Sequence, residues 1–400
     1  MQSEKYDIIV IGAGLVGLST AYHLKLNNPQ LKVLILEKEG KVAQHQSGNN
    51  SGVIHSGIYY KPGSLKSQTC ISGYTSLLHF AEKNEIPYEI CGKIIVATSA
   101  NEIESLNNIY DRGVKNGLVG IRKINADQSR ELEPHCAAIA GIHVPQTGII
   151  DYPKLAVTLQ DLFQNQYGGV IKLNSKVNKI TDYNDHIVIE TNDGTYTADR
   201  IITCAGLFSD RIANLTEKYN DLRIIPFRGE YYKLKADKQY LIKNLIYPVP
   251  NPEFPFLGVH FTRMIGGGVE AGPNAVLAFK REGYKFSDVN LKDIAETVTW
   301  PGFWKIIAKY GSIGIGEIYR SLSKDAFVKA LQKLVPEIKT DDLEEGGAGV
   351  RAQACNRSGF LIDDFNILQS KRITHVRNAP SPAATSSLAI GKLISEKITD

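Results

Sequence analysis

The pattern of apolar and polar residues near the N-terminus predicts a strand, a helix and a second strand. Residues 8–11 are a continuous run of β-branched apolar residues, as in a parallel strand that is buried on both faces. Helix-forming residues follow over 18–26 and stop at Asn27-Asn28-Pro29, and a second apolar run covers 32–36. These elements make a complete βαβ unit, for which a right-handed connection is expected.

A glycine motif lies between the first strand and the helix of this unit. Gly12, Gly14 and Gly17 have the GxGxxG spacing, and Glu37 follows 20 positions after the last glycine. Glycine lets the backbone turn tightly and approach a pyrophosphate, and the helix N-terminus supplies N–H donors and a positive dipole. Glu37 can accept hydrogen bonds from a ribose diol. The motif predicts dinucleotide binding and by itself leaves FAD and NAD open.

The loop after the second strand is rich in small polar residues. Residues 46–57 contain three glycines and His55. Glycine allows the backbone to lie close to a ligand. Because the loop follows a strand end, we expect it to face the cofactor; a plain surface loop is the alternative.

The rest of the chain mixes strand and helix patterns without an internal repeat. We expect strands over 93–97, 141–144, 170–173, 187–189, 196–203, 360–362 and 373–376, and helices over 103–116, 151–167, 209–219 and 384–398. Residues 223–283 alternate β-like runs with Pro and Gly, 291–334 are mostly helical, and 346–351 interrupt that pattern.

Composition narrows the class of protein. Hydrophobic residues make up 43% and charged residues 22%, which is ordinary for a globular protein, and the net charge of +4 is too small to imply nucleic-acid binding. The five cysteines are widely spaced and contain no CxxC, which excludes a disulfide scaffold or a zinc ribbon. No apolar run approaches the ~20 residues of a membrane span. We therefore expect a cytoplasmic protein without a metal site.

Five further segments carry a family resemblance: 47–60 (SGNNSGVIHSGIYY), 257–263 (LGVHFTR), 272–275 (GPNA), 349–353 (GVRAQ) and 378–385 (NAPSPAAT). Together with the βαβ unit, they resemble the FAD-dependent D-amino-acid-oxidase-like (DAO) superfamily and, within it, the L-2-hydroxyglutarate dehydrogenases, also called oxidases. The resemblance implies an α/β fold. A discontinuous Rossmann-like FAD-binding domain (1–87, 144–222 and 346–400) would carry an inserted substrate domain of mixed β-sheet and helices (88–143 and 223–345).

The resemblance also implies a reaction. FAD would take a hydride at N5 from C2 of L-2-hydroxyglutarate, a histidine base would take the hydroxyl proton, and 2-oxoglutarate would form, with electrons passed to a quinone or to oxygen. The alternatives are an amine, amino-acid or glycerol-3-phosphate oxidising relative, or a flavin-binding redox sensor without turnover.

Histidine suits the base because its ordinary pKa lies near neutral pH. His260 is the candidate base or substrate ligand, with a core histidine as the alternative; on a strand it and Arg263 would face opposite sides. His55 is a candidate to contact flavin or substrate, to support its loop or, as the weakest option, to anchor flavin covalently. Arg351 is the best candidate for a substrate carboxylate because arginine suits bidentate recognition.

The remaining candidates are assigned by role. The substrate candidates are Tyr59, Arg228, Arg263 and Lys280. The cofactor candidates are Gly12, Gly14, Gly17, Glu37, Lys38, Asn50, Ser51, Gly52, Val177, Ala205, Gly206, Pro382, Ala383, Ala384 and Thr385. The N-terminus of the last helix, around 383–385, would aim N–H groups at flavin N1 and O2.

Residues 300–310 hold both tryptophans of the chain beside lysines. Such a helix suits the headgroup region of a membrane. The alternative is a domain helix that packs its aromatic residues inward. We therefore expect peripheral contact with the inner face of the cell membrane, where a quinone could accept electrons, as one hypothesis.

Overall fold

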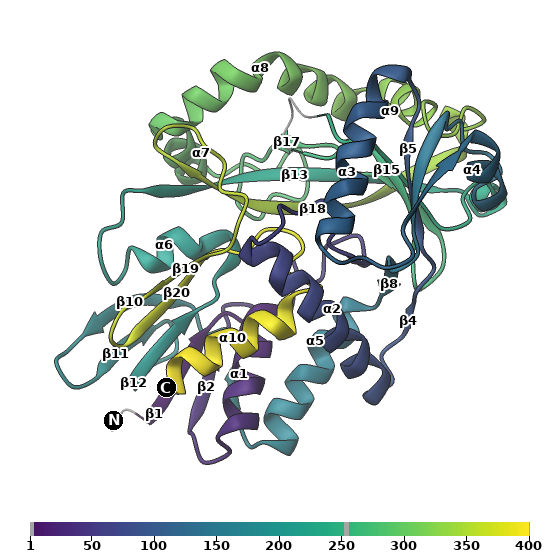
Figure 1. Cartoon of the computed structure of the whole chain (residues 1–400). Helices are drawn as coiled ribbons and strands as arrows, with labels where there is room; N and C mark the ends of the chain where they lie inside the picture. The colour runs from purple at the N-terminus through teal and green to yellow at the C-terminus, as the bar shows by residue number, and fades with distance from the viewer. Residues whose placement is uncertain (1–3, 252–255, 400) are drawn as a thin grey trace.

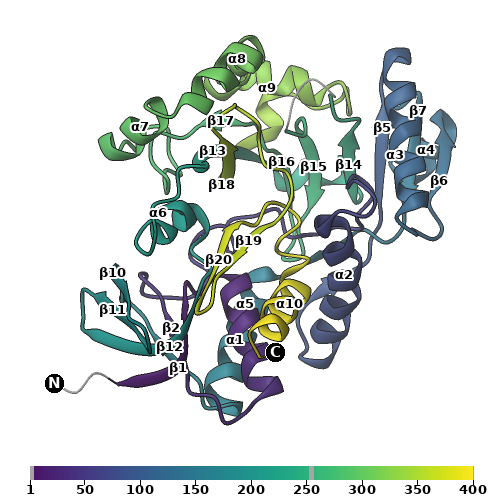
Figure 2. The same cartoon turned by 60° about the vertical axis from the view of Figure 1, so that its left-hand side comes forward.

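The computed structural model describes residues 4–251 and 256–399. Two large β-sheets and a small one form its framework, with helices packed against them (Figure 1). The first large sheet and helices α1, α5 and α10 lie in the lower half of the view, whereas the second large sheet lies in the upper half beneath α8. Figure 2 shows α7, α8 and α9 over the second sheet and α3 and α4 at its far end.

The first sheet has the order β10-β11-β12-β1-β2-β9, with β20 beside β12 and β19 beside β20. Its strands are β1 (Lys5–Ile11), β2 (Val33–Leu36), β9 (Val170–Lys172), β10 (Val177–Asp182), β11 (Ile187–Thr191), β12 (Thr195–Thr203), β19 (Asn366–Gln369) and β20 (Ile373–Asn378). Strand β1 pairs in parallel with both β2 and β12, so the predicted βαβ unit is confirmed at the centre of the sheet.

Alternate residues of β1 enter different cores. Ile8 and Val10 pack with α1 (Leu15–Asn27), α2 (Leu65–Lys83), α5 (Tyr152–Asp161) and α10 (Ser387–Thr399), whereas Ile9 and Ile11 pack with β10 and β11. Burial on both faces accounts for the continuous apolar run in the sequence. The parallel strands therefore present their carboxyl ends at one fixed edge, where ligands of open α/β sheets collect.

The second sheet has the order β17-β13-β16-β15-β14-β5-β7-β6, with β18 beside β13. Its strands are β5 (Lys93–Ala97), β6 (Arg122–Asn125), β7 (Ala140–Val144), β13 (Leu222–Leu234), β14 (Leu245–Pro248), β15 (His260–Arg263), β16 (Val269–Gly272), β17 (Val276–Leu277) and β18 (Leu343–Asn356). A small third sheet has the order β3 (Val53–Ile54), β8 (Gly148–Ile150), β4 (Tyr88–Glu89). Its strands occur where the chain passes from one large sheet to the other.

Helices cover both faces of the second sheet. The helices in this part are α3 (Ile103–Lys115), α4 (Ala126–Leu132), α7 (Leu291–Val298), α8 (Pro301–Leu322) and α9 (Lys324–Leu331). Helix α9 packs with β5, β14, β15 and β16, and α3 packs on the residues of β5 and β14 that face the other way. Helix α8 packs on β13 and β18 through Trp300, Phe303 and Ile306.

The two large sheets divide the chain nearly at the expected domain boundaries. All strands of the first sheet fall within 1–87, 144–222 and 346–400. Strand β18 crosses the expected boundary at 346, because it pairs with β13 along its whole length. The domain limits stay a prediction.

Three local predictions differ from the structure. Residues 346–351 lie inside β18 rather than in a break, and the helix expected over 209–219 is α6 (Ser209–Ala213). Within the described residues, 360–362 form only a bridge between Leu361 and Cys355.

Candidate active site

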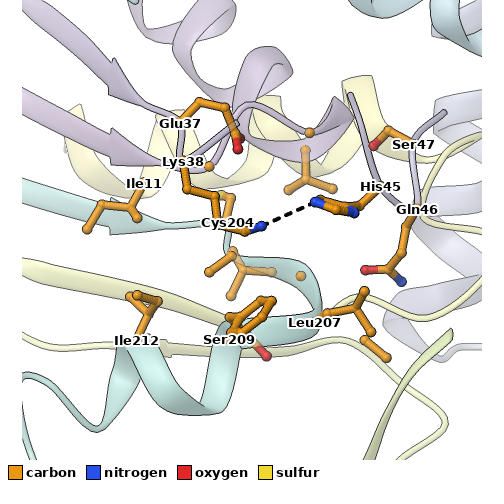
Figure 3. Close-up of a pocket in the computed structure, with 18 of the residues that line it drawn as sticks. Ile11, Glu37, Lys38, His45, Gln46, Ser47, Cys204, Leu207, Ser209 and Ile212 are labelled. Carbon is orange, nitrogen blue, oxygen red and sulfur yellow. Dashed lines mark hydrogen bonds between the residues drawn. The ribbon is translucent and has the colours of Figure 1, made fainter. Parts of the chain in front are cut away.

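A cavity of about 440 Å³ lies at the carboxyl ends of β1, β2 and β12 (Figure 3). Ile11, Glu37 and Cys204 come from these strand ends, and Ser209 and Ile212 come from α6 on the opposite wall. Backbone of the 43–47 loop and of the 376–384 segment completes the lining. This placement is the one expected of a dinucleotide site in an open parallel sheet.

The predicted glycine motif forms one wall of this cavity. Gly12 has φ +107°, and a Cβ there would lie 2.5 Å from the carbonyl oxygen of Cys204. A Cβ on Gly14 would lie 3.2 Å from Oγ of Ser47. The turn between β1 and α1 is therefore packed too closely for a side chain, which leaves its backbone open toward the cavity.

Glu37 and Ser47 hold this turn from two sides. Oε2 of Glu37 accepts a hydrogen bond from the N–H of Ala13 at 2.7 Å. Oγ of Ser47 accepts one from the N–H of Leu15, in the first turn of α1, at 2.9 Å. Sequence reasoning found Glu37 by its spacing but did not single out Ser47, because a serine in a polar loop carries no distinguishing pattern.

Lys38 lies in a charged network at the end of β2. Its ammonium forms ion pairs with Glu39 and Glu282 and lies 3.2 Å from Nε2 of His45, the contact drawn in Figure 3. Burial alone would lower the pKa of Lys38, but the two carboxylates outweigh it and raise the pKa. Burial raises the pKa of Glu282, but its hydrogen bonds with His45 and Lys38 outweigh burial and lower that pKa to about 2. Lys38 thus closes one end of the cavity as a cation already paired with acids.

Asn50 shapes the loop that contains Ser51 and Gly52. Its Nδ2 donates to the carbonyls of Gln46 at 3.1 Å and Ser47 at 2.8 Å, and its Oδ1 accepts from the N–H of Gly52 at 2.9 Å. These bonds hold the loop folded back on itself next to the cavity.

The other cofactor candidates gather at the same cavity. Val177, Ala205, Gly206, Ala383 and Ala384 line it.

Pro382 and Thr385 belong to the turn that carries Ala383 and Ala384. Helix α10 begins at Ser387, later than expected, and the turn before it is closed by a bond from Ala383 N–H to Pro380 O at 2.9 Å. Within the described chain this leaves the N–H groups of Ala384 and Thr385 without a hydrogen-bond partner. Thr385 Oγ1 accepts from the backbone N–H of His55 at 3.1 Å, which ties the turn to the end of β3.

A second group of side chains gathers between β3, β5, β14, β15 and β18. His260, on β15, lies with its ring centroid 4.0 Å from that of Tyr247 on β14. Nζ of Lys93, on β5, lies 4.5 Å from the ring centroid of Tyr59 and 4.8 Å from that of Tyr247. The guanidinium of Arg351, on β18, lies 5.2 Å from the ring of Phe256.

The basic groups of this cluster influence one another. Burial, reinforced by Arg351 and Lys93, lowers the pKa of His260 to about 3. Burial, reinforced by Lys93 and His260, lowers the pKa of His55 to about 3 as well. Burial lowers the pKa of Lys93 to about 7, and burial also lowers the pKa of Arg351. Four basic side chains thus share a buried region in which positive charge is costly, and a bound anion would offset that cost.

Lys93 was not among the residues singled out from the sequence. Its only sequence signal is a lysine at the start of the apolar run Lys93-Ile94-Ile95-Val96-Ala97, all of which is buried. Strand ends often carry a solvated lysine, so the pattern alone does not distinguish it.

The remaining arginine and lysine candidates lie in other surroundings. Arg228 is buried and pairs with Glu230, and one of its N–H groups donates to the carbonyl of Lys285. Arg263 pairs with Glu89, and Lys280 lies in a turn closed by Gly283. The structure therefore brings His55, Tyr59, His260 and Arg351 together, whereas the contacts of Arg228, Arg263 and Lys280 are with other groups. Their role in binding substrate stays a prediction.

The chain is similar to known flavoproteins over almost its whole length. The family model described as "FAD dependent oxidoreductase" (DAO) matches residues 7–397. L-2-hydroxyglutarate dehydrogenase of Indibacter alkaliphilus is 56% identical over 392 residues, which are 98% of this chain and 98% of that protein. Mitochondrial L-2-hydroxyglutarate dehydrogenase of Homo sapiens is 44% identical over 413 residues, which cover 99% of this chain and 89% of that protein.

Solved structures share the fold. L-α-glycerophosphate oxidase of Mycoplasma pneumoniae, solved with FAD bound, has a TM-score of 0.81 at 23% identity and covers 99% of this chain and 95% of that one. Glycine oxidase of Geobacillus kaustophilus has a TM-score of 0.73 at 16% identity, with the same coverage of 99% and 95%. The predicted α/β architecture of an FAD-binding part with a second, mixed sheet is confirmed.

Proposed function

This chain belongs to the DAO family of FAD-dependent oxidoreductases and, within it, to the L-2-hydroxyglutarate dehydrogenases, and we propose on that basis that it oxidises L-2-hydroxyglutarate to 2-oxoglutarate. The observation that carries the proposal is the buried group of His55, Lys93, His260 and Arg351. Buried basic side chains suit a substrate with two carboxylates, and a basic residue held uncharged suits proton removal.

FAD is the cofactor, and the residues at the cavity fit it. Gly12 and Gly14 leave the backbone bare beside the N-terminus of α1, where a pyrophosphate binds. Glu37 lies at the end of β2, where the ribose of a dinucleotide is recognised. Ala384 lines the cavity and Thr385 follows it in the same turn; their N–H groups, which lack a partner within the described chain, can face the isoalloxazine ring.

The reaction divides between cofactor and protein. FAD, when bound, supplies the hydride acceptor for the C2 hydrogen of the substrate. His260 takes the hydroxyl proton as the C2–H bond breaks, and Arg351 binds the carboxylate next to C2. His55, whose Nε2 lies 3.4 Å from Oγ of Ser381, positions the turn before α10 against the substrate. The N–H groups of Ala384 and Thr385 would stabilise negative charge on the flavin ring.

Anaerobic reduction tests the proposed function. Purified holoenzyme is mixed without oxygen with L-2-hydroxyglutarate, its D-enantiomer, sarcosine or glycerol-3-phosphate, and the flavin absorbance is followed. Rapid bleaching by the L-enantiomer alone is expected. Bleaching by sarcosine would instead assign an amine oxidase, bleaching by glycerol-3-phosphate would assign the other relative, and no bleaching by any of them would support a redox sensor.

We further propose that the electrons leave at a membrane surface, through a quinone. Helix α8 buries Phe303 and Ile306 on the second sheet, but Trp304, Ile315 and Leu322 are exposed by 57%, 70% and 66%. These exposed residues recur at helical spacing on the face opposite the buried one. Lys305 and Lys309 flank them, and Glu317 is paired with Arg320, so the helix is cationic overall. An apolar stripe with flanking lysines complements an anionic lipid surface.

Residues 300–310 were expected either to contact a membrane or to pack their aromatic residues inward, and each expectation applies to a different tryptophan. Trp300 packs inward, and Trp304 faces outward. Over the described residues, none of the helices combines the length and the hydrophobicity needed to cross a membrane. The proposal is therefore for contact with the surface of the bilayer. Reoxidation of the reduced enzyme by a quinone analogue or by air separates the two acceptors.

A further inference from the structure

Lys93 belongs to the buried basic group, but the proposed reaction gives it no separate role. Lys93 is the first residue of β5 and is only 2% exposed. The rings of Tyr59 and Tyr247 lie beside its ammonium, and among residues 4–251 and 256–399 no carboxylate pairs with it. A buried ammonium without a counter-charge is costly, because aromatic faces replace only part of its hydration.

The groups that face Lys93 supply no negative charge at neutral pH. They are His55 and Tyr59 from the segment after β3, Cys70 from α2, Tyr247 from β14 and His260 from β15. Burial raises the pKa of the Cys70 thiol to about 12, and burial raises the pKa of both tyrosines, so these groups stay neutral. Arg351 from β18 adds a second cation close to His260. The groups that face Lys93 therefore leave its positive charge uncompensated, and a bound anion would compensate it.

A second observation points to a ligand at the same place. The hydroxyl oxygen of Tyr59 is buried and has no hydrogen-bond partner within the described chain. A buried hydroxyl without a partner is uncommon in a folded protein. One carboxylate bound at Lys93 could do both: it would accept a hydrogen bond from the Tyr59 hydroxyl and supply the negative charge that Lys93 lacks.

We propose that Lys93 binds the distal carboxylate of the dicarboxylate substrate and takes up a proton as the substrate binds. The inference rests on the proposed function. Arg351 lies two residues from Gly349, whose Cα packs against the carbonyl of Asn49 in the cofactor loop, and we therefore assign Arg351 to the carboxylate next to C2. Lys93 lies behind Tyr59 and Tyr247, whose rings suit the methylene groups that separate the two carboxylates.

The sign of the pH dependence follows from burial. Burial lowers the pKa of Lys93 to about 7 in the free protein, and a bound carboxylate raises it again. Below pH 7 Lys93 is already protonated, so ligand binding takes up only a small fraction of a proton. Above pH 7 the free amine must gain a proton on binding, and the affinity is expected to fall up to about tenfold per pH unit.

Calorimetry on the oxidised holoenzyme tests this without turnover. 2-Oxoglutarate is titrated at pH 6 and at pH 8, each in two buffers of different ionisation enthalpy. Most of one proton is expected to be taken up at pH 8 and little at pH 6. Lys93→Met should abolish the uptake and weaken binding about tenfold or more at pH 6. The matched control is Lys123→Met, an exposed lysine on β6 of the same sheet that lies 4.9 Å from the ring of Tyr110; it should leave both quantities unchanged.

A monocarboxylate distinguishes which carboxylate Lys93 holds. Lys93→Met should raise the KM for L-2-hydroxyglutarate much more than the KM for L-2-hydroxybutyrate, which lacks the distal carboxylate. Proton uptake that persists in Lys93→Met, or an equal loss for both substrates, would overturn the assignment while leaving the oxidase activity in place. A wild-type enzyme that neither binds 2-oxoglutarate nor is reduced by L-2-hydroxyglutarate would overturn the proposed function itself. Retained flavin absorbance shows that the variant is folded.

Discussion

The Cα of Gly17 packs so closely against Gly12 that a Cβ at position 17 would lie 2.0 Å from the Gly12 carbonyl oxygen. Helix α1 and the end of β1 meet at this contact, and the same turn presents its backbone to the cofactor cavity. The contact is backbone against backbone, so no side-chain movement can relieve a clash there.

Gly17→Ala should therefore displace the turn and remove FAD. We expect the flavin content of the purified protein, measured as the ratio of flavin to protein absorbance, to fall by at least about tenfold, because closest approach to the pyrophosphate depends on this turn. Gly314→Ala is the control, since a Cβ at that helical position meets nothing within 4 Å. Normal flavin content in Gly17→Ala would show that the turn tolerates the shift.

His260 is held in one tautomer. Its Nδ1 lies 2.9 Å from the carbonyl oxygen of Gly258, and because a carbonyl only accepts hydrogen bonds, Nδ1 carries the proton. The neutral ring then keeps a lone pair on Nε2, as a base requires. Burial lowers the pKa of the ring to about 3, so His260 is neutral over the physiological range.

His260→Gln should lower the rate of anaerobic flavin reduction by about 10²- to 10⁴-fold, the usual range for loss of a general base. Stopped-flow absorbance measures this rate, and the control is His135→Gln, at a half-buried histidine that contacts Glu337. The acid limb of kcat/KM should lie well below pH 6, since an ordinary histidine would place it near 6.5. Reduction at the wild-type rate in His260→Gln would move the role of base to His55.

Lys93→Met should stabilise the protein while it impairs binding. The pKa of Lys93 lies below that of an unfolded lysine, so between pH 7 and about 10.5 the unfolded chain binds the extra proton and the stability of the wild type rises with pH. Below pH 7 the whole cost of the buried ammonium is present, and removing it should gain up to about 5 kcal/mol.

Thermal unfolding of the ligand-free holoenzyme measures this. The Tm of Lys93→Met should exceed that of the wild type by several degrees at pH 6, and the difference should shrink by pH 9. A variant with a lower Tm at every pH would mean that Lys93 has a counter-charge and contributes to stability.

The sequence predicted what is local and missed what depends on distant partners. The βαβ unit and Glu37 follow from the order and spacing of residues within one short segment. Lys93 became recognisable only because β14 and β15, about 150 residues later, bring Tyr247 and His260 beside it. The ion pair of Arg228 with Glu230, by contrast, is local, because residues two apart on a strand face the same side.

Strand β18 shows why a glycine-rich segment was misread. Gly346 and Gly349 were taken as signs of a break, yet both lie in a strand. A Cβ on Gly346 would lie 2.6 Å from the carbonyl oxygen of Tyr231, and one on Gly349 would lie 2.6 Å from that of Asn49. These glycines allow close approach of other backbone to the strand, which short-range propensity does not reveal.

The exposed face of α8 gives the last prediction. Trp304→Glu combined with Ile315→Glu places two acids on the apolar stripe, and both side chains are more than half exposed, so the fold should persist. Burial of these two residues in the headgroup region would contribute about 2 to 4 kcal/mol, and charge repulsion from anionic lipid adds to its loss. Flotation with vesicles that contain phosphatidylserine should therefore fall at least about tenfold, while reduction of a water-soluble dye stays within twofold of the wild type.

Val119→Glu, exposed by 79% in a loop after α3, is the control for adding an acid to any exposed apolar residue. Equal flotation of the double variant and the wild type would show that α8 is not the surface that meets the membrane, and loss of dye reduction would show that the substitutions act on the enzyme rather than on its attachment.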